Sequence, residues 1–286
     1  MRSVRILVAL AAAVGLVAPI GAQTFREAAP FHILISNDDG VHADGLRHVA
    51  SILQAIGTVT IVAPAQNQSA TGHSIVTSQP VFREDLTLPN GMAAIGLTAT
   101  PATTVNIAIR NIVKPRPDLV VAGINRGYNL AQSVALSGTV GAAREAAMHG
   151  IPAIAASLAA AAAPREYIYA AEEVLGVARR AKERILRETY PANTFLNVNV
   201  PPMPEGGYKG YLVTRQAQVR GGQESFAETP DPRTGRPIYF NVYKEGATGP
   251  EGTDVWAVQN GYVSVTPMRI DETETAQLDA LKAWFQ

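Results

Sequence analysis

Residues 31–40 are Phe-His-Ile-Leu-Ile-Ser-Asn-Asp-Asp-Gly, and this stretch decides the fold class. A largely apolar run ends in a polar turn, which is typical of a buried strand at the point where it leaves a sheet. Apolar residues then recur at helical spacing from Leu46 to Ile56, and a second apolar run follows at 59–63. The segment therefore predicts a strand–helix–strand unit with parallel strands and a right-handed crossover.

The same alternation continues along the chain and predicts an α/β fold with one mostly parallel sheet. Further strands are expected at 119–122, 154–157 and 195–200, and further helices at 101–112, 140–149 and 165–189. Residues 123–137 are polar and contain glycine, so we expect a loop there.

The composition changes after Pro201, where proline and glycine become frequent. Strand-like runs at 211–213 and 238–243 interrupt this segment, so we expect a hairpin arm outside the main sheet, over about 205–253. A long disordered loop is the alternative, which the apolar runs disfavour. A last strand at 261–266 and a terminal helix at 276–285 complete the expected fold.

The composition of the whole chain excludes several classes of protein. There is no cysteine, which rules out a disulfide scaffold, a thiolate metal site and a cysteine nucleophile. The 24 basic and 24 acidic residues balance, so no basic surplus exists to bind a nucleic-acid duplex. With 47% hydrophobic residues the chain can bury a substantial core.

Residues 1–22 have the pattern of an export signal. Arg2 and Arg5 precede an uncharged stretch, 6–20, and Ala22 stands at a plausible cleavage point. A buried helix and a retained membrane anchor are the alternatives, but the stretch is short for a membrane span. We therefore expect a single domain, 23–286, that is periplasmic or secreted and not held in a membrane after cleavage.

Four polar clusters follow the predicted strands, at 37–40, 68–74, 123–129 and 137–139. Open parallel sheets bind ligands beyond the carboxyl ends of their strands, so we expect these clusters to meet at one edge. The adjacent carboxylates of Asp38 and Asp39 would repel each other unless a hard divalent cation lay between them. Ser69 and Asn125 can add neutral oxygen ligands. Ordinary turn composition is the alternative for all four residues.

The segment Ser137-Gly138-Thr139 precedes a predicted helix, whose free N–H groups can bind an anion such as phosphate. Simple helix capping is the alternative. His73 is the only histidine in a candidate loop that also carries a possible ligand, and it can protonate a leaving oxygen. The chain has no Gly-x-Ser-x-Gly and no Walker A motif, which disfavours a serine hydrolase and a P-loop kinase.

Five ordered stretches between about 31 and 268 resemble the SurE (survival protein E) family of metal-dependent nucleotidases. They are ILISNDDGVHADGL, VAPAQNQSATGHS, PDLVVAGINRGYN, SGTVGAAREAAMHGIPAIAASL and TDVWAVQNGYVSVTPM. The resemblance implies a Rossmann-like, three-layer α/β core. It also implies a C-terminal hairpin arm for oligomerisation, used in homodimers or homotetramers.

The resemblance further implies removal of phosphate from nucleoside monophosphates with one divalent metal ion, Mg²⁺ or Mn²⁺. By position, the implied metal ligands are Asp38, Asp39, Ser69 and Asn125. The positions implied to surround the substrate phosphate are Asn37, Asn129, Ser137, Gly138 and Thr139. Departures from the usual family sequence occur at Ala65, Gln66, Ala99, Thr103, Thr104 and Ala122, none of which is an implied ligand.

Our hypothesis is an exported phosphomonoesterase that hydrolyses nucleoside 5′- or 3′-monophosphates. Asp38 and Asp39 would act in catalysis through the metal, one of them accepting a proton from water, and His73 would assist the leaving group. The first alternative is a non-catalytic periplasmic binder of phosphate esters. A manganese-dependent glycosyltransferase, which also places acidic residues after a strand, is the second.

Overall fold

The computed structural model describes residues 30–160, 162–219, 222–245 and 248–285. The predicted export signal, residues 1–22, lies outside the described residues. Within these ranges, no helix is long and apolar enough to cross a membrane.

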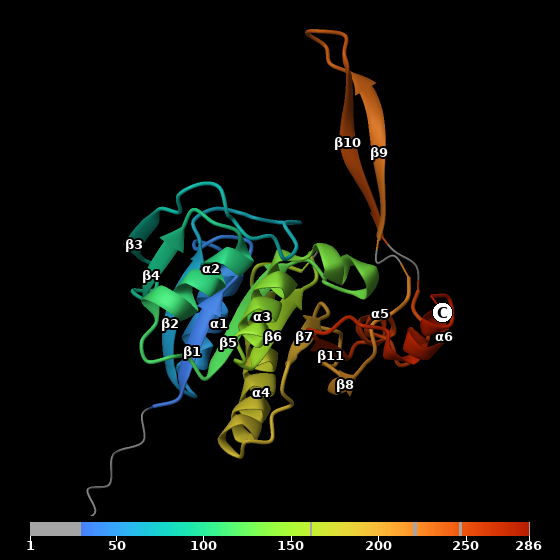
Figure 1. Cartoon of the computed structure of the whole chain (residues 1–286). Coiled ribbons are helices and arrows are strands. Elements are labelled where there is room, and N and C mark those ends of the chain that lie inside the picture. Colours follow the sequence, from blue (N-terminus) through green and yellow to red (C-terminus); the bar gives the residue numbers. More distant parts are fainter. Residues whose placement is uncertain (1–29, 161, 220–221, 246–247, 286) are drawn as a thin grey trace, which may run out of the picture.

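A nine-stranded sheet forms the centre of the protein (Figure 1). Its strands, in chain order, are β1 (His32–Ser36), β2 (Thr58–Pro64), β3 (Arg83–Thr87), β4 (Ala93–Leu97), β5 (Leu119–Arg126), β6 (Ala153–Leu158), β7 (Thr194–Val200), β8 (Tyr211–Val213) and β11 (Val263–Arg269). Across the sheet they follow the order β3-β4-β2-β1-β5-β6-β7-β11-β8. All neighbours from β4 to β7 are parallel, while β3 and β11 pair antiparallel with β4 and β7. The prediction of a mostly parallel α/β sheet is confirmed.

Helices cover both faces of the sheet and make the expected three layers. They are α1 (Asp44–Leu53), α2 (Pro101–Ile107), α3 (Gly138–Met148), α4 (Glu166–Leu186), α5 (Asp254–Gln259) and α6 (Leu278–Lys282). The core on one side joins α1 and α4 to the sheet, and the core on the other side joins α2 and α3. β1 contributes to both, because Ile33 and Ile35 face the first core and Leu34 faces the second. Burial on both faces explains why this strand is an uninterrupted apolar run.

The segment 123–137, predicted as a loop, is a loop only in part, and this prediction is wrong at both of its ends. β5 continues to Arg126, because its backbone pairs with β6 as far as Arg126 opposite Leu158. A 3₁₀ helix then spans Ala131–Leu136. At the end of β5, the backbone hydrogen bonds to β6 keep the polar residues in a strand, since each buried backbone group needs a partner.

Other boundaries also differ from the expectation. The helix predicted at 101–112 divides into α2 and a π-helical turn, Ala108–Ile112. The predicted terminal helix is shorter, with a 3₁₀ turn at Thr275–Gln277 followed by α6. The pattern at β3 and β4 did not predict strands, since β3 is a largely exposed edge strand with a charged sequence.

The arm is a single antiparallel hairpin of β9 (Gly222–Pro230) and β10 (Pro237–Glu245), which extends away from the rest of the protein (Figure 1). β8 belongs to the main sheet, where it pairs parallel with β11. The hairpin thus occupies only the central part of the segment 205–253.

Candidate functional site

The turn that follows β1 packs against the first turn of α3. The Asp38 side chain is buried, and its Oδ1 accepts a hydrogen bond of 2.6 Å from Thr139 Oγ1. A Cβ added at Gly138 would lie 2.8 Å from the Asp38 Cβ, so only glycine permits this approach. The predicted acidic turn and the predicted anion-binding helix end therefore meet.

The end of β5 reaches the same turn from another side. The backbone N–H of Arg126 donates to Asp39 Oδ2 at 2.8 Å. Asn125 directly precedes Arg126, is buried, and donates from Nδ2 to the carbonyl of Gly127 at 2.9 Å. That bond orients the amide and leaves its oxygen as the remaining acceptor.

The loop after β2 makes the third contact. The backbone N–H of Gln68 donates to the Asp38 carbonyl at 2.7 Å, and Ser69 follows on the exposed side of this loop. Further along, the N–H of Gly72 donates to the carbonyl of Leu136 at 3.0 Å, which holds the loop against the start of α3. The Asp38–Asp39 turn thus contacts all three other predicted clusters or their direct neighbours.

The environment of the two carboxyl groups is unfavourable for negative charge. Burial raises the pKa of Asp38 to about 6, and the charge of Asp39 adds to the rise, while the hydrogen bond from Thr139 opposes it. Burial also raises the pKa of Asp39, against the opposing effect of Arg126. Two adjacent carboxyl groups held in this way would be stabilised as anions by a cation.

The donor set fits a hard divalent cation. No group of three or more His, Cys, Asp or Glu residues in the described ranges could hold a metal ion, so any ion at this turn must combine two carboxylates with neutral oxygens. Asn37 lies beside them, with Nδ2 bonded to the Gly40 carbonyl at 2.8 Å and Oδ1 buried without a hydrogen-bond partner. An unpartnered buried oxygen is costly unless a ligand occupies it.

Ser137 is the N-cap of α3, as the capping alternative proposed. Its Oγ accepts a hydrogen bond of 3.1 Å from the N–H of Val140. Capping does not exclude anion binding, because a helix begins with four N–H groups that lack partners within the helix. This helix end lies directly over Asp38, so an anion there would be adjacent to the acidic turn.

Asn129 is held by a set of polar contacts at the ends of β6 and β7. Its N–H donates to Asn199 Oδ1 and its Nδ2 donates to Ser157 Oγ, both at 2.8 Å. Its carbonyl accepts from Asn197 Nδ2 at 2.8 Å and Asn199 Nδ2 at 3.0 Å. Sequence analysis missed these two asparagines, although both stand on the same face of a strand with alternating polarity.

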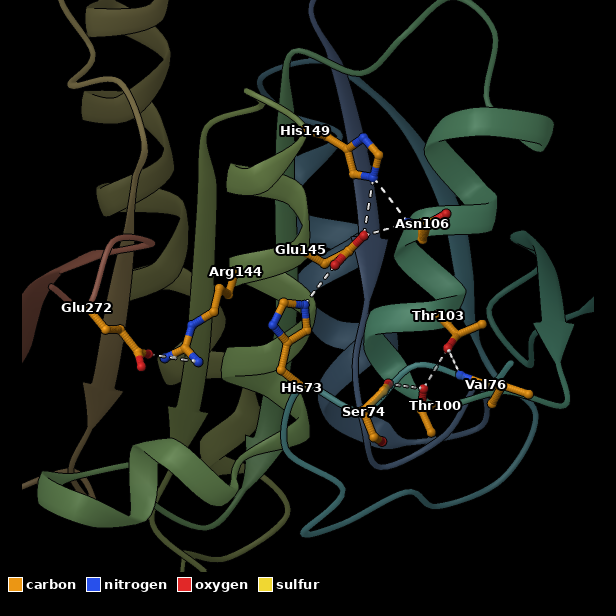
Figure 2. Close-up of polar contacts among 10 residues, drawn as sticks. All are labelled: His73, Ser74, Val76, Thr100, Thr103, Asn106, Arg144, Glu145, His149 and Glu272. Carbon is orange, nitrogen blue, oxygen red and sulfur yellow. Dashed lines mark hydrogen bonds and ion pairs between the residues drawn. The ribbon is translucent and has the colours of Figure 1, made fainter. Parts of the chain in front are cut away.

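His73 is paired with Glu145 of α3 (Figure 2). Its Nε2 lies 2.7 Å from Glu145 Oε2, whose other oxygen lies 3.2 Å from His149 Nε2 and accepts a bond of 2.6 Å from Asn106. Glu145 is buried two turns along α3 from Gly138, and the imidazole of His73 points toward its carboxylate. Glu145 packs inside the protein. In the sequence, its spacing of four residues from His149 is the pattern that indicates a pairing of these two side chains on one helix face.

The fold and the site define a Rossmann-like α/β protein with an acidic, oxygen-lined site beyond the carboxyl ends of its parallel strands. Residues 33–223 match the sequence model of the family described as survival protein SurE. The chain therefore belongs to the SurE family, as the sequence resemblance predicted.

Individual relatives agree with this assignment. A protein named 5′-nucleotidase SurE from Geobacter sulfurreducens is 41% identical over 259 residues, which cover 88% of this chain and 93% of the relative. A protein of the same name from Aeromonas hydrophila is 42% identical over 262 residues, which cover 88% of this chain and 98% of the relative. The crystal structure of the SurE protein from Aquifex aeolicus superposes with a TM-score of 0.72 at 35% identity, over 89% of this chain and all of that one.

Proposed function

We propose that this chain is a metal-dependent 5′-nucleotidase that hydrolyses nucleoside monophosphates to nucleoside and phosphate. The observation that carries the proposal is the convergence on one turn. Asp38 accepts from Thr139 of α3, Asp39 accepts from the N–H beside Asn125, and the Asp38 carbonyl accepts from the N–H beside Ser69. Membership of the SurE family and the names of its relatives support the same activity.

In this proposal Asp38, Asp39, Ser69 and Asn125 hold one divalent ion, Mg²⁺ or Mn²⁺. When bound, such an ion supplies Lewis-acid polarisation of a phosphoryl oxygen. The chain's own groups bind and orient the phosphate. The Ser137 hydroxyl and the Gly138 N–H are donors for its oxygens, while the Thr139 hydroxyl donates to Asp38 and orients that carboxylate. The unpartnered amide oxygen of Asn37 can accept a hydrogen bond from the substrate. The proposed role of His73 in protonating the leaving group would fall to its Nδ1 atom, because Nε2 is bonded to Glu145.

The decisive experiment measures phosphate release from AMP by the purified chain with Mn²⁺ or Mg²⁺. We expect turnover that EDTA abolishes and that added metal restores. Asp39→Asn should reduce kcat/KM by about three orders of magnitude or more, because a neutral amide binds a divalent ion weakly. Activity of this variant within a few-fold of wild type would contradict the metal role.

The same assay decides between the enzyme and the alternative, a non-catalytic binder of phosphate esters. Tight binding of AMP without release of phosphate would favour the binder. A parallel series with 3′-AMP tests whether hydrolysis extends to 3′-monophosphates, which the hypothesis includes.

We also propose that the protein is exported and acts in the periplasm or outside the cell. The basic start and the uncharged stretch of residues 1–22 support this. Determination of the N-terminus of the mature protein, recovered from its own cells, tests it. A mature chain that still begins at Met1 would contradict export.

A further inference from the structure

A cavity of about 330 Å³ opens beside Asp39, on the side of the sheet that α1 and α4 cover. Asp39 and Arg126 line the end of the cavity next to the acidic turn. Its remaining walls are largely apolar and include Leu158, Ala159, Pro164 and the ring of Tyr167. The size is at the lower end of the range of small-molecule sites in proteins.

The ring of Tyr167 is held firmly. It stacks on His48 with ring centroids 6.1 Å apart and an angle of 17° between the planes. A Cβ added at Gly45 of α1 would come within 2.9 Å of Tyr167 Cε1, so the helix packs directly against the ring edge. An aromatic ring that is fixed before binding loses little freedom when a second planar group stacks on it.

The polar groups of the cavity exclude a second phosphate site. Asp39 and Asp44 both line it and Arg126 is the one cationic residue of the lining, while Asp44 is also paired with Arg47 on α1. The Tyr167 hydroxyl makes no hydrogen bond within the described part of the chain and remains a donor, since burial raises its pKa to about 12. A neutral, planar ligand with its own donors and acceptors suits this lining, whereas a second anion does not.

We propose that this cavity holds the nucleobase of the substrate, with Tyr167 as the stacking surface and the Arg126 guanidinium at its mouth. The inference rests on the proposed function and extends it, because it assigns the part of the protein that prefers nucleotides over other phosphate esters. Asp39 belongs both to the acidic turn and to the cavity wall, so the cavity opens directly beside the proposed metal and phosphate site. Bases of any type stack on aromatic rings, so the cavity favours nucleosides as a class.

The test compares AMP with ribose 5-phosphate, which carries the same sugar and phosphate but no base. We expect Tyr167→Ala to raise KM for AMP about tenfold or more, as loss of a base–aromatic stack does, with kcat changed by no more than a few-fold. KM and kcat for ribose 5-phosphate should stay within about twofold of wild type. Tyr167→Phe, which keeps the ring, should behave like wild type. Tyr169→Ala is the matched control, because Tyr169 lies on the same helix, is 40% exposed and does not line the cavity.

Equal losses with both substrates would assign Tyr167 a purely structural role and overturn the proposal. Unchanged kinetics with both would overturn it as well. If the wild-type chain hydrolysed neither substrate, the proposed function would fail by itself. The affinities of wild type and Tyr167→Ala for AMP and ribose 5-phosphate, measured by calorimetry, would then test whether the cavity binds the base. Weaker binding of AMP alone would support it, and no difference would overturn it.

Discussion

At the scale of single residues, the site depends on a close approach between two segments that are 101 residues apart, the Asp38 turn and the start of α3. Gly138 permits this approach because it has no side chain to occupy the space that Asp38 fills. Thr139 then supplies the hydroxyl that bonds the carboxylate. Both residues resemble ordinary helix-start residues in the sequence, and only their position over Asp38 gives them a further role.

Gly138→Ala should therefore reduce activity more than it reduces stability. The new methyl group would lie 2.8 Å from the Asp38 Cβ and 3.0 Å from its Oδ2, so the carboxylate or the helix start must move. Because misplacement by about 1 Å costs enzymes around a hundredfold in rate, we expect kcat/KM for AMP to fall by that order. Gly96→Ala in β4 is the matched control, since its added Cβ would meet nothing closer than 3.6 Å. Equal activity of the two variants would contradict the role given to Gly138.

At the scale of elements, α3 organises the site along its length. Its first turn contacts the acidic turn, and its third turn carries Glu145, which binds His73 and so holds the loop after β2 against the helix (Figure 2). Gly141 lies between them, where a Cβ would come within 2.3 Å of the Gly72 carbonyl oxygen. The helix thus positions the loop that carries Ser69.

The buried charge of Glu145 should make part of the stability dependent on pH. Burial raises its pKa, but the hydrogen bonds from His73 and Asn106 and the electrostatic effect of both histidines outweigh this, so the net pKa is lowered. A carboxyl group with a lowered pKa in the folded chain stabilises the fold above its unfolded pKa. That contribution is lost as the pH falls through the lowered value.

We expect Glu145→Gln to lower the free energy of unfolding by about 1–3 kcal/mol at pH 7, as measured by urea denaturation. The difference from wild type should shrink as the pH falls below the ordinary pKa of a glutamate, about 4.3, and through the lowered pKa of Glu145 in the folded chain. Glu172→Gln on the exposed side of α4 is the control and should change little at any pH. A difference that stays constant throughout acid titration of the folded protein would show that shape, not charge, causes the loss.

At the scale of the whole molecule, the hairpin of β9 and β10 has no partner within the described chain (Figure 1). Isolated two-stranded hairpins are at best marginally stable in water. Ile238, Phe240 and Val242 alternate along one face of β10, and Phe240 is 58% exposed. Exposed apolar rows of this kind favour association, so we propose that the arm contacts further copies of the chain in a homodimer or homotetramer.

Light scattering should give the wild-type protein the mass of a dimer or tetramer. Phe240→Asp places a charge in the middle of the apolar row and should shift the mass toward the monomer at micromolar concentration. Leu186→Asp, an equally drastic change at an exposed position at the end of α4, is the control and should leave the mass unchanged. A monomeric wild type would contradict the proposal, and so would an unchanged mass of the Phe240 variant.

The strand–helix alternation, the parallel sheet and the four polar clusters at its edge can all be predicted from the amino-acid sequence. These features are local, because burial on two faces makes strands continuous apolar runs and polar turns mark where strands end. The order of the five sequence motifs also indicates the SurE family. The edge strands β3 and β8 were not placed in the sheet, since an exposed or very short strand has little apolar pattern of its own.

Tertiary structure alone decided what each polar residue contacts. His73 and Glu145 are 72 residues apart, and nothing local in either segment indicates that they pair, so the role of His73 in holding the loop after β2 is seen only in the folded chain. The asparagines of β7 that secure Asn129, and the cavity that joins Asp39 to Tyr167, likewise form only when distant segments pack together. The physical reason is that periodicity reports which side of an element is buried, whereas the partner on that side depends on how the elements pack.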